Sequence, residues 1–249
     1  IVGFDFGTSS LKLAVRQPYT AGEPVVVRPV DEALRSGSHP YLWQTALWFD
    51  PAKQEFSLVP ADGLVSLEGF ETGIIGGTGG QRVREDQPVN RNEAALAFIA
   101  LQLAHFFGWY HEDRPLRGGA DRFLSINVGI PVAAQDDRLG FANFRRIISA
   151  ASKLIPHASR LTLGQVRETF NSTSDQLPAG WEVIPELTAA IAGYAASTAA
   201  RDGSHMLVDV GASTLDLVAF NLVGRDGIAV ISAAVELLGS ASLDIARSH

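Results

Sequence analysis

Two short segments of the chain place an acidic residue, a glycine and small hydroxyl residues in the same order. Asp5-Phe6-Gly7-Thr8-Ser9-Ser10 lies near one end, and Asp209-Val210-Gly211-Ala212-Ser213-Thr214 lies near the other. Glycine and small hydroxyl residues allow consecutive backbone N–H groups to converge on an anion. An acid at the end of the preceding strand is well placed to hold Mg²⁺ or its water ligands. The two segments therefore indicate a paired phosphate and magnesium site.

Ordinary β-hairpins have a similar turn composition, because aspartate and glycine favour turns for conformational reasons alone. The recurrence favours the phosphate interpretation. When Val2 to Val15 is placed beside Met206 to Ala219, Asp5 falls on Asp209 and Gly7 falls on Gly211, with apolar residues on both sides. Each copy is typical of a buried strand, a tight polar turn and a returning strand. We therefore expect two facing hairpins that hold a triphosphate from both sides.

Strand and helix patterns alternate along the chain, which predicts a mixed α/β fold. Apolar runs bounded by turn residues predict strands at 1–6, 11–15, 25–30, 45–49, 55–59, 123–128, 206–209, 215–223 and 228–234. A nearly continuous apolar run at 92–110 predicts a largely buried helix, capped by Asn90 or Asn92. A second helix is expected to follow Asp136, which would cap it. A third is expected at 186–199, because the fixed φ of Pro185 suits the first turn of a helix.

The composition excludes several kinds of site. The chain has 249 residues, no cysteine and a net charge of −7. The lack of cysteine excludes a disulfide scaffold and a thiolate site, and the negative charge argues against nucleic-acid or anionic-lipid partners. The histidines lack paired metal-binding spacing, and Gly76 to Gly80 lacks the Gly-Lys-Ser/Thr ending of a P-loop. We expect a cytoplasmic protein that binds neither nucleic acid nor membranes.

The residues resemble the actin, sugar-kinase and heat-shock-chaperone ATPase superfamily, whose two lobes each contribute one hairpin of the kind formed by Asp5 to Ser10. The nucleotide-binding domain of DnaK-type seventy-kilodalton chaperones looks most similar. Ile126 to Pro131 resembles its proline-ended strand, Asp137-Arg138 the next helix start, and Glu186-Leu187-Thr188-Ala189-Ala190 its linking helix. The resemblance covers both ends of the chain and Phe123 to Arg138.

The resemblance implies an actin-like, ribonuclease H-like ATPase fold, with a mixed five-stranded sheet flanked by helices and a small inserted α+β subdomain. It implies a first-lobe core at 1–30 and 120–201, an inserted subdomain at 31–119, and the opening strands of a second lobe at 202–249. ATP or ADP and Mg²⁺ would be the cofactors. Asp5, Glu186 and Asp209 would be catalytic, with Asp5 and Asp209 organising Mg²⁺ and Glu186 orienting the attacking water. The nucleotide would be bound by Gly7, Thr8, Ser9, Ser10, Gly211, Ala212, Ser213, Thr214 and Asp216.

Three functions are compatible with these residues. A chaperone-like ATPase would couple ATP binding and slow hydrolysis to lobe closure, with a client protein or co-chaperone bound by regions outside this chain. The second function is a regulator or scaffold that binds nucleotide without hydrolysing it. It is indicated by Ala212 and Ser213, which stand where the resembled family has glycines. The lysine with which the first lobe of that family contacts the γ-phosphate is also absent, although Arg82 or Arg84 could substitute as the cation. A small-molecule kinase is the third, since 7–12 also resembles sugar kinases.

The chain is expected to be part of a longer protein. Its only methionine is Met206, and nothing after Gly239 supplies the adenosine-binding segment that the resemblance implies. Binding of Mg-ATP by these 249 residues alone is therefore expected to be weaker than low micromolar.

Overall fold

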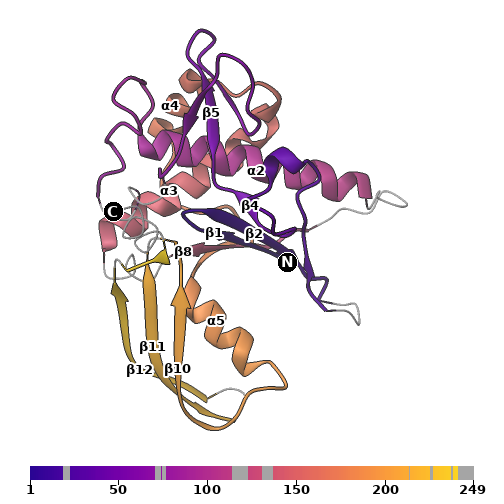
Figure 1. The fold of residues 1–249 in the computed structure, drawn as a ribbon, viewed down its shortest axis with the longest axis vertical. Coiled ribbons are helices and arrows are strands. Elements are labelled where there is room, and N and C mark those ends of the chain that lie inside the picture. The colour runs from indigo at the N-terminus through magenta and orange to yellow at the C-terminus, as the bar shows by residue number, and fades with distance from the viewer. Residues whose placement is uncertain are drawn as a thin grey trace.

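The computed structural model describes residues 1–18, 23–70, 74, 77–113, 123–130, 137–212, 214–224, 227–236 and 238–240. Within these residues the chain forms three β-sheets, with helices above the largest sheet and one helix beside the lowest sheet (Figure 1). The predicted mixed α/β fold with a mixed sheet is confirmed.

The largest sheet has the strand order β3-β2-β1-β8-β9. Its strands are β1 (Val2–Phe6), β2 (Ser10–Val15), β3 (Val25–Val26), β8 (Ile126–Ile130) and β9 (Trp181–Pro185). β2 runs antiparallel to both β1 and β3, whereas β8 is parallel to β1 and β9 is parallel to β8. A short strand that the sequence analysis did not predict, β4 (Trp43–Gln44), also pairs with β2, so this sheet has six strands rather than the expected five.

Helices cover the upper face of this sheet (Figure 1). They are α2 (Arg91–Asp113), α3 (Arg138–Leu154) and α4 (Leu163–Ser172), with short 3-10 turns η1 (Glu32–Leu34) and η3 (Ile155–Arg160). Asn90 caps α2, because its Oδ1 accepts from the Glu93 N–H and Glu93 Oε2 accepts from the Asn90 N–H, each at 2.9 Å. The cap of α3 is Asp137, which accepts from the Leu139 N–H at 3.1 Å, rather than the predicted Asp136, which lies outside the described residues.

Alternation along β1 separates an apolar face from a polar one. Val2, Phe4 and Phe6 are buried, and Phe6 stacks on Phe98 of α2 with ring centroids 5.5 Å apart. Asp5 therefore points away from the α2 layer, while the residues on each side of it are anchored in the core. This packing holds the end of β1 in a defined position.

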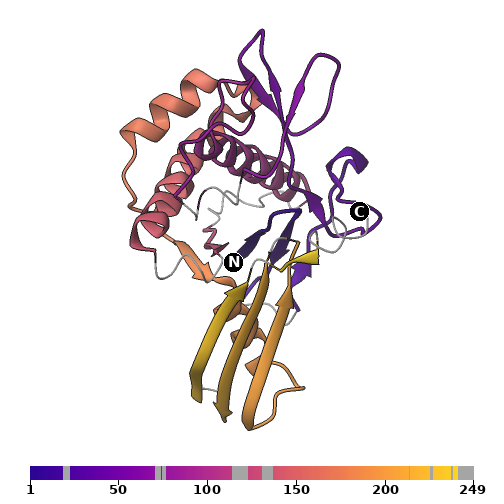
Figure 2. The ribbon, with the colours of Figure 1, turned by 60° about the vertical axis from the view of Figure 1, so that its left-hand side comes forward.

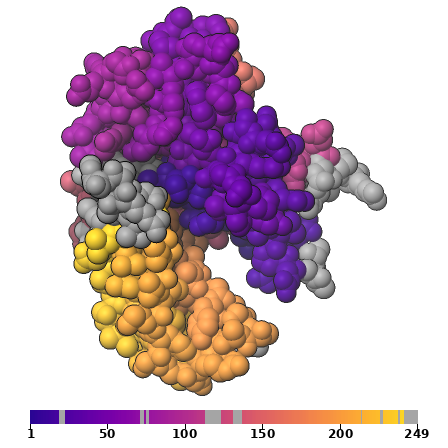
Figure 3. Space-filling model, viewed as in Figure 1, coloured from indigo at the N-terminus to yellow at the C-terminus, as the bar shows by residue number. Residues whose placement is uncertain are grey.

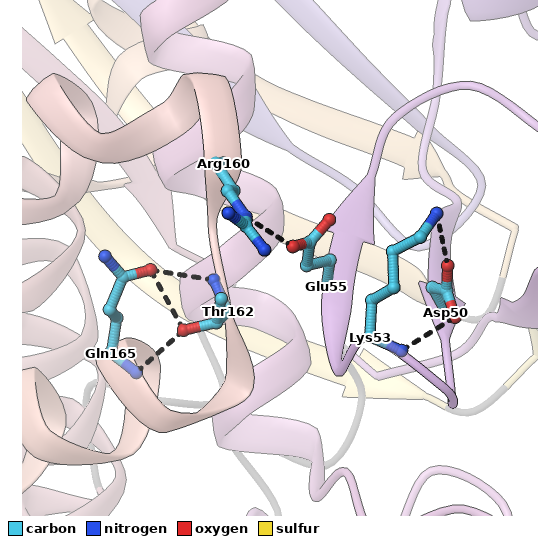
Figure 4. Close-up of polar contacts among 6 residues, drawn as sticks. All are labelled: Asp50, Lys53, Glu55, Arg160, Thr162 and Gln165. Atoms are coloured by element: carbon cyan, nitrogen blue, oxygen red, sulfur yellow. Dashed lines mark hydrogen bonds and ion pairs between the residues drawn. The ribbon is translucent and has the colours of Figure 1, made fainter.

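A second, three-stranded sheet is formed by β5 (Leu47–Asp50), β6 (Glu55–Ser57) and β7 (Val65–Leu67). The predicted hairpin across 50–53 is confirmed as the antiparallel pair β5 and β6. Figure 4 shows how this hairpin is joined to the start of α4: Arg160 Nε donates to Glu55 Oε1 at 2.6 Å, and Thr162 with Gln165 forms a capping box. Backbone bonds from Phe56 N to Leu161 O and from Leu163 N to Gln54 O complete the junction.

The third sheet contains the second predicted hairpin and has the order β10-β11-β12, with β10 (Gly203–Val210), β11 (Leu215–Val223) and β12 (Gly227–Glu236). Helix α5 (Glu186–Ala195) ends earlier than the predicted residue 199. It packs Leu187 and Ile191 against Val218 and Phe220 in a second apolar cluster, and Figure 2 shows it running beside these strands. Because α5 contacts β8 and β9 as well as β11, it joins the main sheet to the β10–β12 sheet. The domain boundaries at 31, 120 and 202 stay predictions.

Among the described residues, no helix is long and apolar enough to cross a membrane.

Candidate functional site

The two predicted hairpins have the same backbone construction. In the first, Asp5 pairs with Lys12 across the strands, and the Gly7 N–H donates to Ser10 O at 3.2 Å. In the second, Asp209 pairs with Asp216, and the Gly211 N–H donates to Thr214 O at 2.9 Å. The repeat seen in the sequence is therefore also a repeat of register and of turn geometry.

The turn glycines are constrained by close contacts rather than by unusual backbone angles. A Cβ atom on Gly7 would lie 2.8 Å from Ser10 O, and one on Gly211 would lie 3.3 Å from Thr214 O. The carbonyls of both glycines are also bound by distant segments: Thr45 Oγ1 donates to Gly7 O at 2.8 Å, and the Ser240 N–H donates to Gly211 O at 2.9 Å. Each turn is thus packed tightly and held from outside the hairpin.

Asp5 and Glu186 meet beside a glycine of the neighbouring strand. Gly129 lies on β8, on the same face as Asp5, and Glu186 is the first residue of α5. A Cβ placed on Gly129 would lie 3.5 Å from both Asp5 Oδ1 and Glu186 Oε1. The absence of a side chain at position 129 leaves the space in which these two carboxyl groups approach each other.

Lys12 is the cation at this site. Its Nζ donates to Asp5 Oδ2 at 2.8 Å, and its side chain is about half exposed, at 59%. Partial burial acts to lower the pKa of Lys12, but the carboxylate of Asp5 and the more distant Asp209 and Glu186 outweigh it and raise the pKa. The sequence analysis placed Lys12 on the second strand without assigning it a role. The four-residue turn places Lys12 opposite Asp5, so the sequence could have predicted that these two residues form an ion pair.

Glu186 carries the strongest electrostatic perturbation. Burial, followed by the negative charges of Asp5, Asp216 and Asp209, raises the pKa of Glu186 to about 8, against the smaller opposing effect of Lys12. Glu186 Oε1 is buried and has no hydrogen-bond partner among the described residues. A carboxyl group with these properties holds a proton near neutral pH and releases it when a cation approaches.

Asp216 contributes a second buried carboxyl group from the other hairpin. It is 5% exposed, its Oδ2 accepts from Thr214 Oγ1 at 3.4 Å, and its Oδ1 has no partner within the described part of the chain. Burial raises the pKa of Asp216, and the charge of Asp209 adds to the increase, although the Thr214 hydrogen bond opposes it. Unpaired buried carboxyl oxygens are costly, and a bound cation or hydrogen-bond donor would relieve that cost.

The predicted site residues fall into two groups on facing elements. Asp5 ends β1, followed by the turn at 7–10, while Asp209, Gly211, Ala212, Thr214 and Asp216 belong to the second hairpin; Ser213 lies outside the described residues. Figure 3 shows the N-terminal hairpin, in indigo, between the upper body and the β10–β12 sheet. Among the described non-glycine residues only Gln54 has a positive φ, so Ala212 fits its turn without backbone strain. Groups of three or more acidic or histidine side chains able to hold a metal directly do not occur in the part of the chain described.

Comparison with models of known protein families finds no match to this chain, and comparison with curated protein sequences finds none. The superfamily resemblance therefore depends on the motifs and on the geometry of the two hairpins.

Proposed function

We propose that this chain binds a nucleoside triphosphate with Mg²⁺ between its two hairpins. The observation that carries the proposal is the structural repeat: both hairpins have the same register, the same glycine-to-carbonyl bond and an acid at the same position, Asp5 in one and Asp209 in the other. Two facing turns of this kind suit a polyphosphate, whose oxygens accept hydrogen bonds from backbone N–H groups on both sides.

The charges favour a bound divalent cation. Asp5, Glu186, Asp209 and Asp216 interact electrostatically at the site, and Lys12 is the cation that pairs with one of them. Mg²⁺ is usually held by one or two carboxylates, several waters and phosphate oxygens. Asp5 and Asp209 would hold Mg²⁺ or its waters, and the ion would supply charge stabilisation for the phosphates. Glu186 Oε1 and Asp216 Oδ1, which have no hydrogen-bond partner among the described residues, fit such a site.

Glu186 would act on water rather than on the nucleotide itself. In the ligand-free chain a pKa of about 8 keeps Glu186 protonated near neutral pH, and Mg²⁺ held beside it would lower this pKa, so that the ionised carboxylate could accept a proton from water. Its position at the start of α5, beside Asp5, would place a water near the terminal phosphate. Catalysis of phosphoryl transfer depends mainly on positioning and on charge stabilisation.

We also propose that the chain has the actin-like ATPase fold, with the cofactors ATP or ADP and Mg²⁺. Support comes from the order of the main sheet, in which an antiparallel β3-β2-β1 unit is followed by the parallel strands β8 and β9, and from the second hairpin that opens another sheet. The chaperone-like role, its client or co-chaperone, and the cytoplasmic location belong to this proposal.

Isothermal titration of the chain with Mg-ATP tests the proposal. We expect Asp209→Asn to weaken binding at least about tenfold, because a carboxylate near Mg²⁺ loses its charge. Asp62→Asn is the matched control, since Asp62 is an exposed residue between β6 and β7 and should leave binding unchanged. Equal binding by wild type and Asp209→Asn, or no binding at all by wild type, would contradict the proposal.

A regulator that binds nucleotide without hydrolysing it is the second candidate. It is favoured by the ion pair of Lys12 with Asp5, which leaves the lysine engaged within its own hairpin. Steady-state phosphate release separates the two functions. Turnover that is lost in Asp209→Asn would establish an ATPase, whereas binding without turnover would establish the regulator.

A further inference from the structure

Two carbonyl groups of the first hairpin turn accept hydrogen bonds from Thr45, a residue outside the hairpin. Thr45 Oγ1 donates to Gly7 O at 2.8 Å, and the Thr45 N–H donates to Ser9 O at 3.5 Å. In an ordinary four-residue turn, the first carbonyl accepts from the N–H three residues later, which here would be that of Ser10. Among the described residues, the Gly7 carbonyl accepts instead from the Thr45 hydroxyl.

These two contacts fix the direction of two N–H groups of the turn. In a planar trans peptide unit, the carbonyl and the N–H of the next residue point to opposite sides of the chain. Because Gly7 O points toward Thr45, the Thr8 N–H is directed away from Thr45. The Ser10 N–H is directed away as well, because Ser9 O also points toward Thr45. Two donors are thereby held on one side of the turn, an arrangement that suits an anion.

Thr45 is itself held firmly by the core. It is 5% exposed, and Trp43 and Leu47 on either side of it are fully buried. The indole Nε1 of Trp43 donates to Val27 O at 3.0 Å, and β4 pairs with β2 directly after the turn. Side chains packed in this way have little room to move, so the Thr45 hydroxyl stays at a fixed place beside the turn.

The Gly7 carbonyl depends on the Thr45 hydroxyl more than the Ser9 carbonyl depends on the Thr45 N–H. Ser9 O has a second donor, Ser36 Oγ at 3.4 Å, whereas the hydroxyl is the donor to Gly7 O. Loss of the hydroxyl would allow the Gly7–Thr8 peptide to rotate, so that Gly7 O accepts from the Ser10 N–H as in an ordinary hairpin. Both N–H groups would then be withdrawn from the ligand side.

We propose that Thr45 is a positioning residue, whose hydroxyl holds the first turn in the conformation that binds phosphate. The inference rests on the proposed function for the identity of the ligand, a nucleoside triphosphate with Mg²⁺. Thr45 acts through the backbone of Gly7 and Thr8 and does not itself touch the phosphates. The segment around β4 therefore controls the affinity of a turn that lies more than thirty residues earlier in the chain.

The experiment compares wild type with Thr45→Val, Thr45→Ser and Thr173→Val. Valine keeps the β-branched shape of threonine without its donor, whereas serine keeps the hydroxyl. Thr173 is the matched control, because it is also 5% exposed and its Oγ1 donates to a backbone carbonyl, Thr169 O, at 2.7 Å. It lies at the end of α4, outside the candidate site.

Calorimetric titration with inorganic tripolyphosphate and with Mg-ATP measures the effect. We expect Thr45→Val to bind both ligands at least about tenfold more weakly, because Gly7 O loses its donor and the turn rearranges. Thr45→Ser should restore both affinities to within about threefold of wild type. Thr173→Val should unfold at a lower urea concentration than wild type but bind both ligands equally well. In wild type, the amide resonances of Thr8 and Ser10 should shift on addition of tripolyphosphate, and this measurement decides the matter if Thr45→Val does not fold.

The outcomes separate this inference from the proposed function. Wild-type affinity in Thr45→Val, equal weakening in Thr45→Ser or Thr173→Val, or unshifted Thr8 and Ser10 amides would refute the positioning role. Asp209-dependent binding of Mg-ATP would then leave the proposed function standing. Binding of tripolyphosphate that depends on the Thr45 hydroxyl, without any binding of Mg-ATP, would support the positioning role and refute the proposed function. Failure of wild type to bind either ligand would refute both.

Discussion

At the scale of single residues, the candidate site is defined by buried carboxyl groups that lack hydrogen-bond partners. Glu186 Oε1 and Asp216 Oδ1 are buried without hydrogen bonds among the described residues, and Lys12 pairs with Asp5. Such an arrangement reduces the stability of the folded protein, because these carboxyl groups lie close together in a partly buried environment. Strained electrostatics of this kind is characteristic of functional sites.

Glu186 should make the stability of the ligand-free protein depend on pH. Its pKa is about 8 in the folded chain against an ordinary value of 4.5, so between these values the folded state holds a proton that the unfolded state releases. The free energy of unfolding should therefore fall as the pH rises from 5 to about 8.5. Glu186→Gln keeps a neutral group, and the variant should be more stable than wild type at pH 8.5 by ~1–3 kcal/mol.

Urea unfolding of both proteins at several pH values, without Mg²⁺ or nucleotide, measures this difference. Glu182→Gln is the control, because Glu182 is exposed on β9 and should follow the wild-type profile. Parallel profiles for wild type and Glu186→Gln would show that Glu186 does not titrate in this range.

At the scale of elements, the hairpin turns are the parts whose geometry tolerates least change. Gly3 and Gly7 belong to the same hairpin, but a Cβ on Gly3 would lie 4.0 Å from the nearest neighbouring atom, Ala14 O, whereas one on Gly7 would lie 2.8 Å from Ser10 O. The first distance is ordinary contact and the second requires the backbone to move.

We therefore expect Gly7→Ala to destabilise the chain by ~1–3 kcal/mol and to weaken Mg-ATP binding, since the turn must open. Gly3→Ala should change the free energy of unfolding by less than about 1 kcal/mol and leave binding intact. Thermal unfolding and calorimetric titration of the two variants give the comparison. Equal destabilisation of both variants would mean that the turn contact at Gly7 has no special role.

At the scale of the whole molecule, the main sheet and the β10–β12 sheet differ in how fully their side chains are buried. In β8, which lies between β1 and β9, Ile126, Val128 and Ile130 are buried, whereas nearly every residue of β12 is exposed. Strands with few buried contacts open locally at lower free energy than central strands.

Hydrogen exchange followed by mass spectrometry should show this difference. Amides of 227–236 in the ligand-free chain should exchange roughly 10–100-fold faster than those of 126–130, because β12 is an edge strand with little apolar packing. Similar protection of the two segments would contradict this view of the β10–β12 sheet.

The sequence by itself determined the local features. Both hairpins, the acids at the ends of β1 and β10, the long buried helix α2 and the start of α5 follow from alternation, turn residues and capping residues, which act over a few neighbouring positions. Even there, the boundaries moved, as with Asp137 in place of Asp136, because the exact residue at which a helix begins depends on its surroundings.

Only the tertiary structure decided which of these features meet. The approach of Glu186 to Asp5 beside Gly129, the raised pKa of Glu186 and the hydrogen bond from Thr45 to the first turn each join residues that are far apart in the chain. Such contacts depend on strand order and on the packing of helices across the sheet, and burial and summed charge then set the electrostatics. Short-range sequence patterns carry none of these quantities.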